Sequence, residues 1–233
     1  MNKVKTMAIA KDLVVDYPEV KYLDTTHILG KEYPVLVHKI DQIRGKDVSS
    51  SDFQIIVDEI TTIELVEATR NFKLEEYDLE TPICKMIGHR IAGKKMVFAP
   101  IMRAGLGMTT AAKRLYPKAC VGHIGMYRDE NTSNPVEYYW KMPGQIEERV
   151  VFVLDPMLAT GGSANAAISK LKMLGCKSIK FVGIVAAPQG IDVLQRNHPD
   201  VDIYVGAVDL GLNKNNYIVP GLGDAGDRIF GTK

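Results

Sequence analysis

The chain has 233 residues, 46% of them hydrophobic and 24% charged, which suits one large domain and the composition of a folded globular protein. Its 29 basic and 28 acidic side chains leave a net charge of +1, and no apolar run approaches the roughly 18–20 residues that span a bilayer. This balance argues against nucleic acid or a membrane as partner. Three cysteines without a secretion signal predict free thiols in a cytoplasmic protein.

The hydrophobic pattern is weak at the start of the chain and becomes clear at the first predicted helix. Residues 1–33 are mixed in character, and their pattern does not distinguish an arm, an edge element or a disordered leader. Ser49–Asp52 is typical of a helix start, and apolar residues then recur every three to four positions. We therefore predict an amphipathic helix over 51–70, with Glu64 and Glu67 solvated on or beside one of its faces.

Strands and helices alternate through the rest of the chain. A short strand is expected at 81–87 and a turn at 91–94, and the alternating residues 136–140 predict half of an extended hairpin. The other expected strands cover 96–102, 120–127, 149–154, 178–188 and 201–209, and the expected helices cover 108–115, 163–174 and 190–199. This order predicts an α/β fold with a parallel sheet, which binds ligands at the carboxyl ends of its strands.

The most informative segment is DPMLATGGS, which runs from Asp155 to Ser163 between a buried strand and a helix. Its two glycines let successive backbone N–H groups turn toward one spot, and the helix end adds about half a positive charge. The hydroxyls of Thr160 and Ser163 add donors. These features predict a cradle for a phosphate monoester. The alternative is an ordinary strand–helix connection with a capping serine.

Two other nucleotide-binding motifs fail on inspection. None of the pairs Gly30-Lys31, Gly45-Lys46 and Gly93-Lys94 is followed by Ser or Thr, as a Walker loop requires. Gly221–Gly226 matches GxGxxG, but only seven residues follow it, too few for the βαβ unit of a dinucleotide site. We interpret this glycine-dense loop, which carries Asp224, as backbone wrapped closely around a small flat ligand.

Several segments together resemble the motif set of uracil phosphoribosyltransferases. They are FAPIMRAGLGM, MYRDE, VLDPMLATGGS, VAAPQGI, HPDVDIY and YIVPGLGDAGDRIFGTK, in order from about Val35 onward. The resemblance implies a phosphoribosyltransferase-type core over 35–233, with a parallel sheet and helices on both faces. It also implies a hairpin flap at about 128–145 and a small uracil-binding hood at about 210–233. Residues 1–34 form an extension of unknown role.

The resemblance implies a reaction that joins uracil to 5-phosphoribosyl 1-diphosphate (PRPP), giving UMP and diphosphate in pyrimidine salvage. Arg103 would begin the diphosphate loop, Asp155 would hold the ribose hydroxyls, and Asp224 would be a second acid near the ribose or the metal-bound diphosphate. These three are the implied catalytic residues. The implied PRPP contacts are Arg103, Ala104, Gly105, Arg128, Asp155, Pro156, Met157, Leu158, Ala159, Thr160, Gly161, Gly162, Ser163 and Asp224.

Uracil recognition is assigned by the same resemblance to backbone groups at Ile218, Gly223 and Ala225, beside Asp224. Other phosphoribosyltransferases usually carry a second acid where this chain has Pro156. Mg²⁺ is therefore expected to be carried by the diphosphate and water, and no residue is assigned as a metal ligand.

Alternatives to this enzyme stay open at the level of sequence. One is a non-catalytic regulator on the same fold that senses PRPP or UMP, and another is a phosphoribosyltransferase for a different base. The intact Arg103, Asp155 and Asp224 favour the uracil enzyme. Because family members are often dimers or tetramers and some respond to GTP, a homo-oligomer and a GTP effector are further expectations. Helix 51–70 is the candidate pairing surface.

Overall fold

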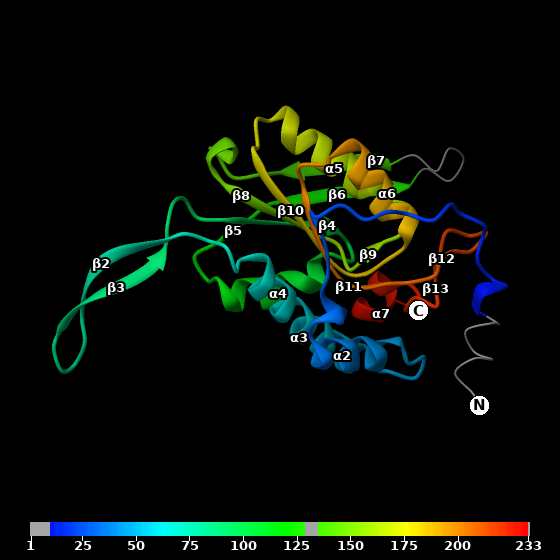
Figure 1. Ribbon diagram of the computed structural model, residues 1–233, viewed down its shortest axis with the longest axis horizontal. Coiled ribbons are helices and arrows are strands. Elements are labelled where there is room, and N and C mark those ends of the chain that lie inside the picture. Colours follow the sequence, from blue (N-terminus) through cyan, green and yellow to red (C-terminus); the bar gives the residue numbers. More distant parts are fainter. Residues whose placement is uncertain (1–9, 129–134, 233) are drawn as a thin grey trace.

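The computed structural model describes residues 10–128 and 135–232, in which nine strands form the central sheet. All neighbouring strands in this sheet run parallel except β6 and β7 (Figure 1). In spatial order the strands are β1 (Thr26–Ile28), β11 (Asp202–Val208), β10 (Ser178–Ala186), β8 (Val150–Leu154), β4 (Val97–Met102), β6 (His123–Arg128) and β7 (Pro135–Lys141), with β5 (Cys120–Val121) beside β4 and β9 (Met157–Leu158) beside β10.

Helices cover both faces of the sheet, as predicted. One face packs against α2 (Pro34–Arg44), α3 (Ser50–Ala68), α4 (Leu106–Leu115) and α7 (Ala225–Phe230), and the other against α5 (Gly162–Met173) and α6 (Pro188–Asn197). The cross-strand pair Phe98 and Phe152 faces the first layer, with ring centroids 5.6 Å apart, while Val97 and Val151 face the second. Central strands are apolar throughout because both of their faces are buried.

The predicted helix at 51–70 is confirmed as α3. Its start follows the sequence signal, because the Ser49 hydroxyl accepts a hydrogen bond from the Asp52 N–H and so caps the first turn. The predicted hairpin strand at 136–140 is also confirmed, since β7 pairs antiparallel with β6. Gly175 follows α5 with a φ of 85°, as expected of a residue just past a helix end.

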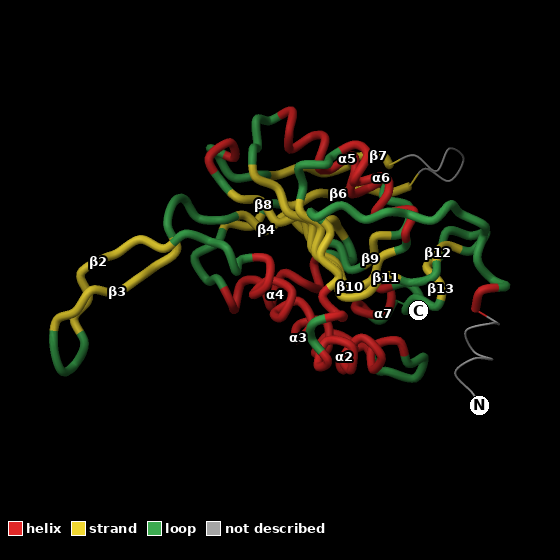
Figure 2. Tube along the Cα trace, viewed as in Figure 1, coloured by secondary structure: helices red, strands yellow, loops and turns green. Residues whose placement is uncertain are grey.

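The expected strand at 81–87 was wrong in its bounds. The chain forms a two-stranded hairpin of β2 (Leu74–Glu80) and β3 (Lys85–Ile91) that projects from the body of the molecule (Figures 1 and 2). Its turn lies at 81–84, because the Thr81 hydroxyl accepts hydrogen bonds from the N–H groups of Ile83 and Cys84. An exposed hairpin lacks the one-sided apolar pattern by which sequence analysis finds strands.

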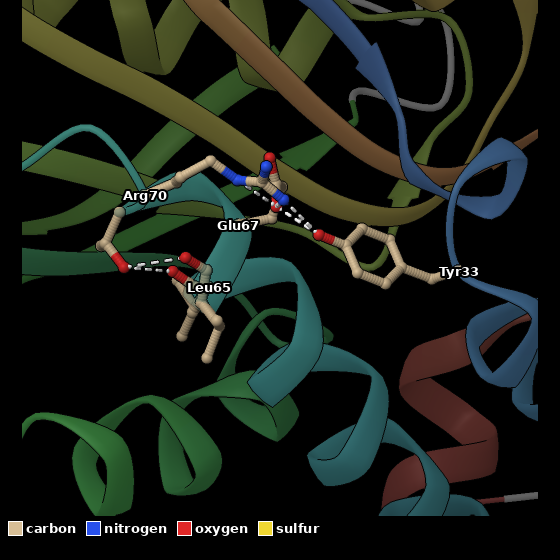
Figure 3. A network of polar contacts seen from close by, with 6 residues as sticks. Tyr33, Leu65, Glu67 and Arg70 are labelled. Atoms are coloured by element: carbon tan, nitrogen blue, oxygen red, sulfur yellow. Dashed lines mark hydrogen bonds and ion pairs between the residues drawn. The ribbon is translucent and has the colours of Figure 1, made fainter.

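The expectation that Glu64 and Glu67 are solvated was also wrong. Glu64 is fully buried, and burial raises the pKa of its carboxyl well above 4.5. Figure 3 shows Glu67 accepting hydrogen bonds from the Tyr33 hydroxyl, at 2.5 Å, and from Arg70. Burial opposes ionisation of Glu67, but these donors outweigh it and lower its pKa. Both carboxyls therefore belong to the packing of α3.

Candidate active site

The two predicted PRPP loops leave from neighbouring strands. β4 and β8 lie side by side in the centre of the sheet, so the loops that follow their carboxyl ends meet at one edge. Gly105 carries the contact between them, because a Cβ at this position would lie 2.3 Å from the carbonyl oxygen of Leu154. The sheet thus brings the segments 103–105 and 155–163 together, as the sequence predicts.

The phosphate loop ends at the N-terminus of α5. Asn165 makes the first bond of the helix, to the Gly161 carbonyl oxygen at 2.8 Å, so the N–H groups of 162–164 have no partner within the helix. The Gly162 N–H makes a long contact of 3.5 Å to the Thr160 hydroxyl oxygen. Gly161 has a φ of 79°, and a Cβ there would lie 2.9 Å from the Gly190 carbonyl oxygen. The loop has the shape and the free donors of an anion site.

Asp155 is held by the sheet rather than by a free loop. The sequence places the end of the strand at Asp155-Pro156, but β9 resumes the pairing with β10 in the same register. The Asp155 N–H donates to Val182 O at 3.2 Å, and the Pro156 carbonyl oxygen accepts from Ile184 at 3.1 Å. The Asp155 carboxylate itself accepts from the N–H of Met157 at 3.2 Å. Its backbone is therefore fixed on both sides.

Arg103 and the C-terminal segment contact each other directly. The Arg103 guanidinium is half exposed and donates to the carboxylate of Asp227 at 3.0 Å. Behind it, the side chain of Ala104 lies beside Gly226, where an added Cβ would approach it to 3.7 Å. The predicted diphosphate loop and the predicted uracil loop are therefore in contact, although they lie more than a hundred residues apart in the chain.

The hood is built on a short ribbon of β12 (Gly211–Leu212) and β13 (Ile218–Val219). Its cross-strand bonds run from Asn213 N–H to Tyr217 O and from Leu210 N–H to Val219 O, both at 2.9 Å. Because alternate residues in an antiparallel pair point their backbone groups to opposite sides, the N–H and C=O of Ile218 face away from β12. These are the groups that the sequence assigns to uracil.

A buried ion pair anchors the loop that follows this ribbon. The Arg44 guanidinium donates to both carboxylate oxygens of Asp209, at 2.6 and 2.8 Å, and to the Gly221 carbonyl oxygen at 2.7 Å. Asp209 in turn accepts from the Gly221 N–H at 2.9 Å. Gly221 has a φ of 61°, and a Cβ there would lie 2.2 Å from the Ile218 carbonyl oxygen. The anchor therefore sets the position of the Ile218 backbone.

Asp224 begins the last helix of the hood. Its carboxylate accepts from the N–H of Asp227 at 3.0 Å and so caps α7. Gly223 precedes it with a φ of 79°, and Ala225 is the buried first residue of the helix. A cavity of about 290 Å³ opens on this segment, lined by Lys46, Val48, Ser50, Tyr217, Asp224, Asp227 and Arg228.

Sequence reasoning missed several residues that build this site. Asp227 lies within the PGLGDAGD motif and could have been found there, but nothing in the local sequence links Arg44 to Asp209. Arg128 ends β6 with its backbone opposite Pro135. Residues 129–134 of the predicted flap lie outside the described residues, so the flap and the contact of Arg128 with PRPP stay predictions.

Two further observations concern metals and membranes. Within residues 10–128 and 135–232, no three His, Cys, Asp or Glu side chains are grouped so that they could hold a metal ion. In the same part of the chain, no helix is both long and apolar enough to cross a bilayer.

Comparisons with known proteins give the family. Residues 31–232 match the family model of uracil phosphoribosyltransferase. The uracil phosphoribosyltransferase of Finegoldia magna is 55% identical over 202 residues, which are 87% of this chain and 97% of that protein. That of Clostridium botulinum (Eklund 17B) is 51% identical over 206 residues, 88% of this chain and 99% of the relative.

One solved structure is similar to this chain in both fold and sequence. The AQ2163 protein from Aquifex aeolicus has a TM-score of 0.81 to this chain at 35% identity, and the match covers 85% of this chain and 95% of that one. The family match over residues 31–232 defines the chain as a phosphoribosyltransferase, and its parallel sheet with helices on both faces agrees with that class. Within that class, it belongs to the uracil phosphoribosyltransferase family.

Proposed function

We propose that the chain transfers the phosphoribosyl group of PRPP to uracil, giving UMP and diphosphate in pyrimidine salvage. The observation that carries this proposal is the meeting of Arg103 with Asp227, which joins the diphosphate loop to the hood. A donor of sugar and an acceptor base can then lie side by side. The two relatives described above match over 97–99% of their own length, which supports the same activity for the whole chain.

Three groups of described residues bind the three parts of PRPP, which are its 5′-phosphate, its ribose and its diphosphate. The N–H groups of 162–164, which have no partner within α5, receive the 5′-phosphate together with the Ser163 hydroxyl. Asp155 accepts hydrogen bonds from the ribose hydroxyls, and Arg103 binds the diphosphate with its planar fork. Because the Arg103 side chain is half exposed, its guanidinium is accessible to a diphosphate beside Asp227.

The bond changes then follow from this placement. N1 of uracil bonds to the anomeric carbon of the ribose, the bond from that carbon to the diphosphate oxygen breaks, and the N1 proton leaves. The ribose becomes oxocarbenium-like while negative charge grows on the diphosphate. Arg103 stabilises that charge, and the two loops hold the reacting atoms in position, which together are the main sources of rate in such a reaction.

Uracil is read by backbone rather than side-chain groups. Its O2, N3–H and O4 present an acceptor, a donor and an acceptor, which fit the outward N–H and C=O of Ile218 and the backbone of the 223–225 turn. Cytosine presents a mismatched set. A buried mismatch of this kind gives discrimination of about 10⁴.

Magnesium fits this site as a companion of PRPP. Asp155 and Asp224 are the carboxylates that we assign to PRPP, and they could hold the hydrated ion that the diphosphate carries. When bound to the diphosphate, Mg²⁺ neutralises part of the charge on the leaving group.

The test is to incubate the purified chain with uracil, PRPP and Mg²⁺ and to measure UMP and diphosphate. Equal amounts of the two products are expected, with no product from orotate, hypoxanthine or adenine. A non-catalytic regulator would bind PRPP or UMP in calorimetry and release neither product. A phosphoribosyltransferase for another base would turn over one of the three alternative bases faster than uracil.

We further propose that the chain forms a homo-oligomer through the hairpin β2–β3. In the described part of the chain this hairpin pairs with no third strand, and its side chains Ile83, Met86 and Ile87 are 92%, 47% and 49% exposed. An isolated two-stranded hairpin is only marginally stable in water, so we expect its exposed apolar side chains to pack against a second copy of the chain. The other candidate surface, on helix 51–70, stays a prediction, because α3 buries one face in the core and leaves Ile55 and Val66 exposed on another.

Light scattering tests the oligomer. The wild type is expected to be a dimer or larger, and Ile83→Lys combined with Ile87→Lys is expected to lower its mass. A monomeric wild type would refute the proposal. The assay with added GTP tests the expected effector, and the cytoplasmic location stays a prediction supported by free thiols at Cys84, Cys120 and Cys176.

A further inference from the structure

The segment before the family match lies against elements of the site. The family match begins at residue 31, and the described residues 10–25 precede both it and β1. In Figure 1 this blue segment passes β12 and then crosses α6 before it enters the sheet as β1. We call residues 14–26 the N-terminal brace. It accounts for part of the extension to which the sequence assigned no role.

The brace contacts the base-reading ribbon at its outer strand. The Val15 N–H donates to the carbonyl oxygen of Leu212 at 2.8 Å, and the Val14 side chain covers Gly211, where an added Cβ would lie 2.8 Å from it. Leu212 is the cross-strand partner of Ile218. One hydrogen bond therefore links the brace, through a single strand, to the backbone that we assign to uracil.

The brace also contacts α6, through side chains that point from one face of that helix. The Tyr17 hydroxyl donates to Asp192 at 2.6 Å. Gln195, three residues further along, accepts from the Leu23 N–H and the Thr26 hydroxyl and donates to the Lys21 carbonyl oxygen. Asp192 and Gln195 are each only 8% exposed, so these are buried polar groups that the brace satisfies.

The same helix packs against the predicted phosphate loop near its N-terminus. Gly190 of α6 approaches the loop so closely that an added Cβ would lie 2.6 Å from the Ala159 carbonyl oxygen, and Gly161 approaches Gly190 in return. A shift of α6 would therefore move the phosphate cradle. The brace thus contacts two elements: the β12–β13 ribbon, which we assign to uracil, and α6, which packs against the loop that we assign to the 5′-phosphate.

We propose that the N-terminal brace holds the β12–β13 ribbon and α6 in place, so that Val15 is a positioning residue for uracil and Tyr17 for the 5′-phosphate of PRPP. The ligand names rest on the proposed function; the mechanical role does not. Two paired residues a strand make a weak ribbon, and the Val15 bond adds to its outer edge. Without that bond the Ile218 backbone samples more positions, which weakens ground-state and transition-state binding of uracil alike.

Two variants of the full chain separate the two contacts. Val15→Pro removes the N–H donor, and Val20→Pro is its control, because the Val20 N–H has no bonding partner among the described residues. Tyr17→Phe removes the hydroxyl bonded to Asp192, and Tyr22→Phe is its control, since no partner of the Tyr22 hydroxyl lies in the described part of the chain. Each pair makes the same chemical change in the same segment.

The two variants are expected to raise KM for different substrates. Val15→Pro raises KM for uracil about fivefold and Tyr17→Phe raises KM for PRPP about threefold, each with kcat nearly unchanged, as the loss of one hydrogen bond predicts. Amide hydrogen exchange of 211–219 in the free protein becomes faster in Val15→Pro and not in Val20→Pro. Equal KM values and equal exchange in variants and controls would overturn the proposal.

The same experiment distinguishes failure of the brace from failure of the proposed function. An inactive wild type would refute the uracil reaction, while the exchange comparison would still decide whether residues 14–26 stabilise the ribbon. An active wild type with unchanged variants would refute the brace alone.

Discussion

Gly221 shows how one backbone position constrains the Ile218 backbone, to which we assign uracil. Its φ is 61°, and the space that a side chain would need is occupied by the Ile218 carbonyl oxygen at 2.2 Å. Gly93 is also in the left-handed region, at 86°, but nothing lies within 4 Å of an added Cβ. Both glycines adopt a backbone conformation that is strained for other residues, but only Gly221 has an atom where a side chain would lie. Comparing the two therefore separates the effect of backbone strain from the effect of displacing the Ile218 carbonyl.

We therefore expect Gly221→Ala to raise KM for uracil at least about tenfold, because the clash moves the groups that bind the base. Gly93→Ala should lower thermal stability slightly and leave KM unchanged. Steady-state kinetics and melting curves of the two variants check this. A normal KM in Gly221→Ala would show that Ile218 does not read the base.

The charged residues of the site allow a second prediction at this scale. Asp224→Asn keeps the cap on α7, because asparagine caps helices as well as aspartate does, but it removes the charge. Arg103→Ala removes the diphosphate contact. Each is expected to lower kcat at least about tenfold with the fold intact, since a charged contact contributes roughly 1.5–3 kcal/mol. Asp78→Asn and Arg114→Ala, at exposed positions, are the controls.

At the scale of elements, the hood depends on a helix from the other end of the chain. α2 supplies Arg44, whose bonds to Asp209 and Gly221 hold the loop between β11 and α7. The Asp209 side chain is only 6% exposed. Without Arg44 beside it, burying its charged carboxylate would lower the stability of the fold. The β12–β13 ribbon, to which we assign uracil, therefore lies between two supports, Arg44 on one side and the N-terminal brace on the other.

Arg44→Ala is expected to lower the free energy of unfolding by about 3 kcal/mol and to weaken uracil binding, because it leaves a buried carboxylate unpaired. Arg114→Ala, which breaks a pair whose arginine is 74% exposed, is expected to cost less than about 1 kcal/mol. Urea unfolding of both variants measures the difference. Equal losses would mean that the Arg44 pair is not a buried anchor.

At the scale of the whole molecule, Glu64 links stability to pH. Burial raises the pKa of its carboxyl in the folded state above the ordinary value of 4.5, so the folded protein holds a proton that the unfolded chain loses. The stability that this proton supports is fully present below the unfolded pKa and is lost as the pH rises through the folded pKa.

Glu64→Gln keeps the shape of the side chain and cannot ionise. The variant is therefore expected to gain stability relative to the wild type as the pH is raised from 5 toward 8. Urea unfolding across that range measures the trend. Glu59→Gln, on the exposed face of the same helix, is expected to leave the pH profile of the wild type unchanged. A pH-independent difference between Glu64→Gln and the wild type would contradict the assignment.

The parts of this molecule that sequence could predict are those whose causes are local. Strand β8, the glycines of the phosphate loop and the serine cap of α3 follow from neighbouring residues, and they were predicted correctly. The burial of Glu64 and the pairing of Arg44 with Asp209 were not, because each depends on contacts between elements far apart in the chain. The motif PGLGDAGD predicts a uracil-binding hood but gives no sign of the Arg44–Asp209 pair that supports this segment.

The unbroken register on either side of Asp155 has a consequence for the thermodynamics of binding. Because β8 and β9 both pair with β10 and the backbone between them is hydrogen-bonded to that strand, the Asp155 backbone has little freedom to lose if a ribose binds there. Affinity for the sugar is then set by the contacts formed and the water displaced, with little entropic penalty from the protein. Calorimetry with PRPP should accordingly find a smaller unfavourable entropy than a site on a disordered loop would give.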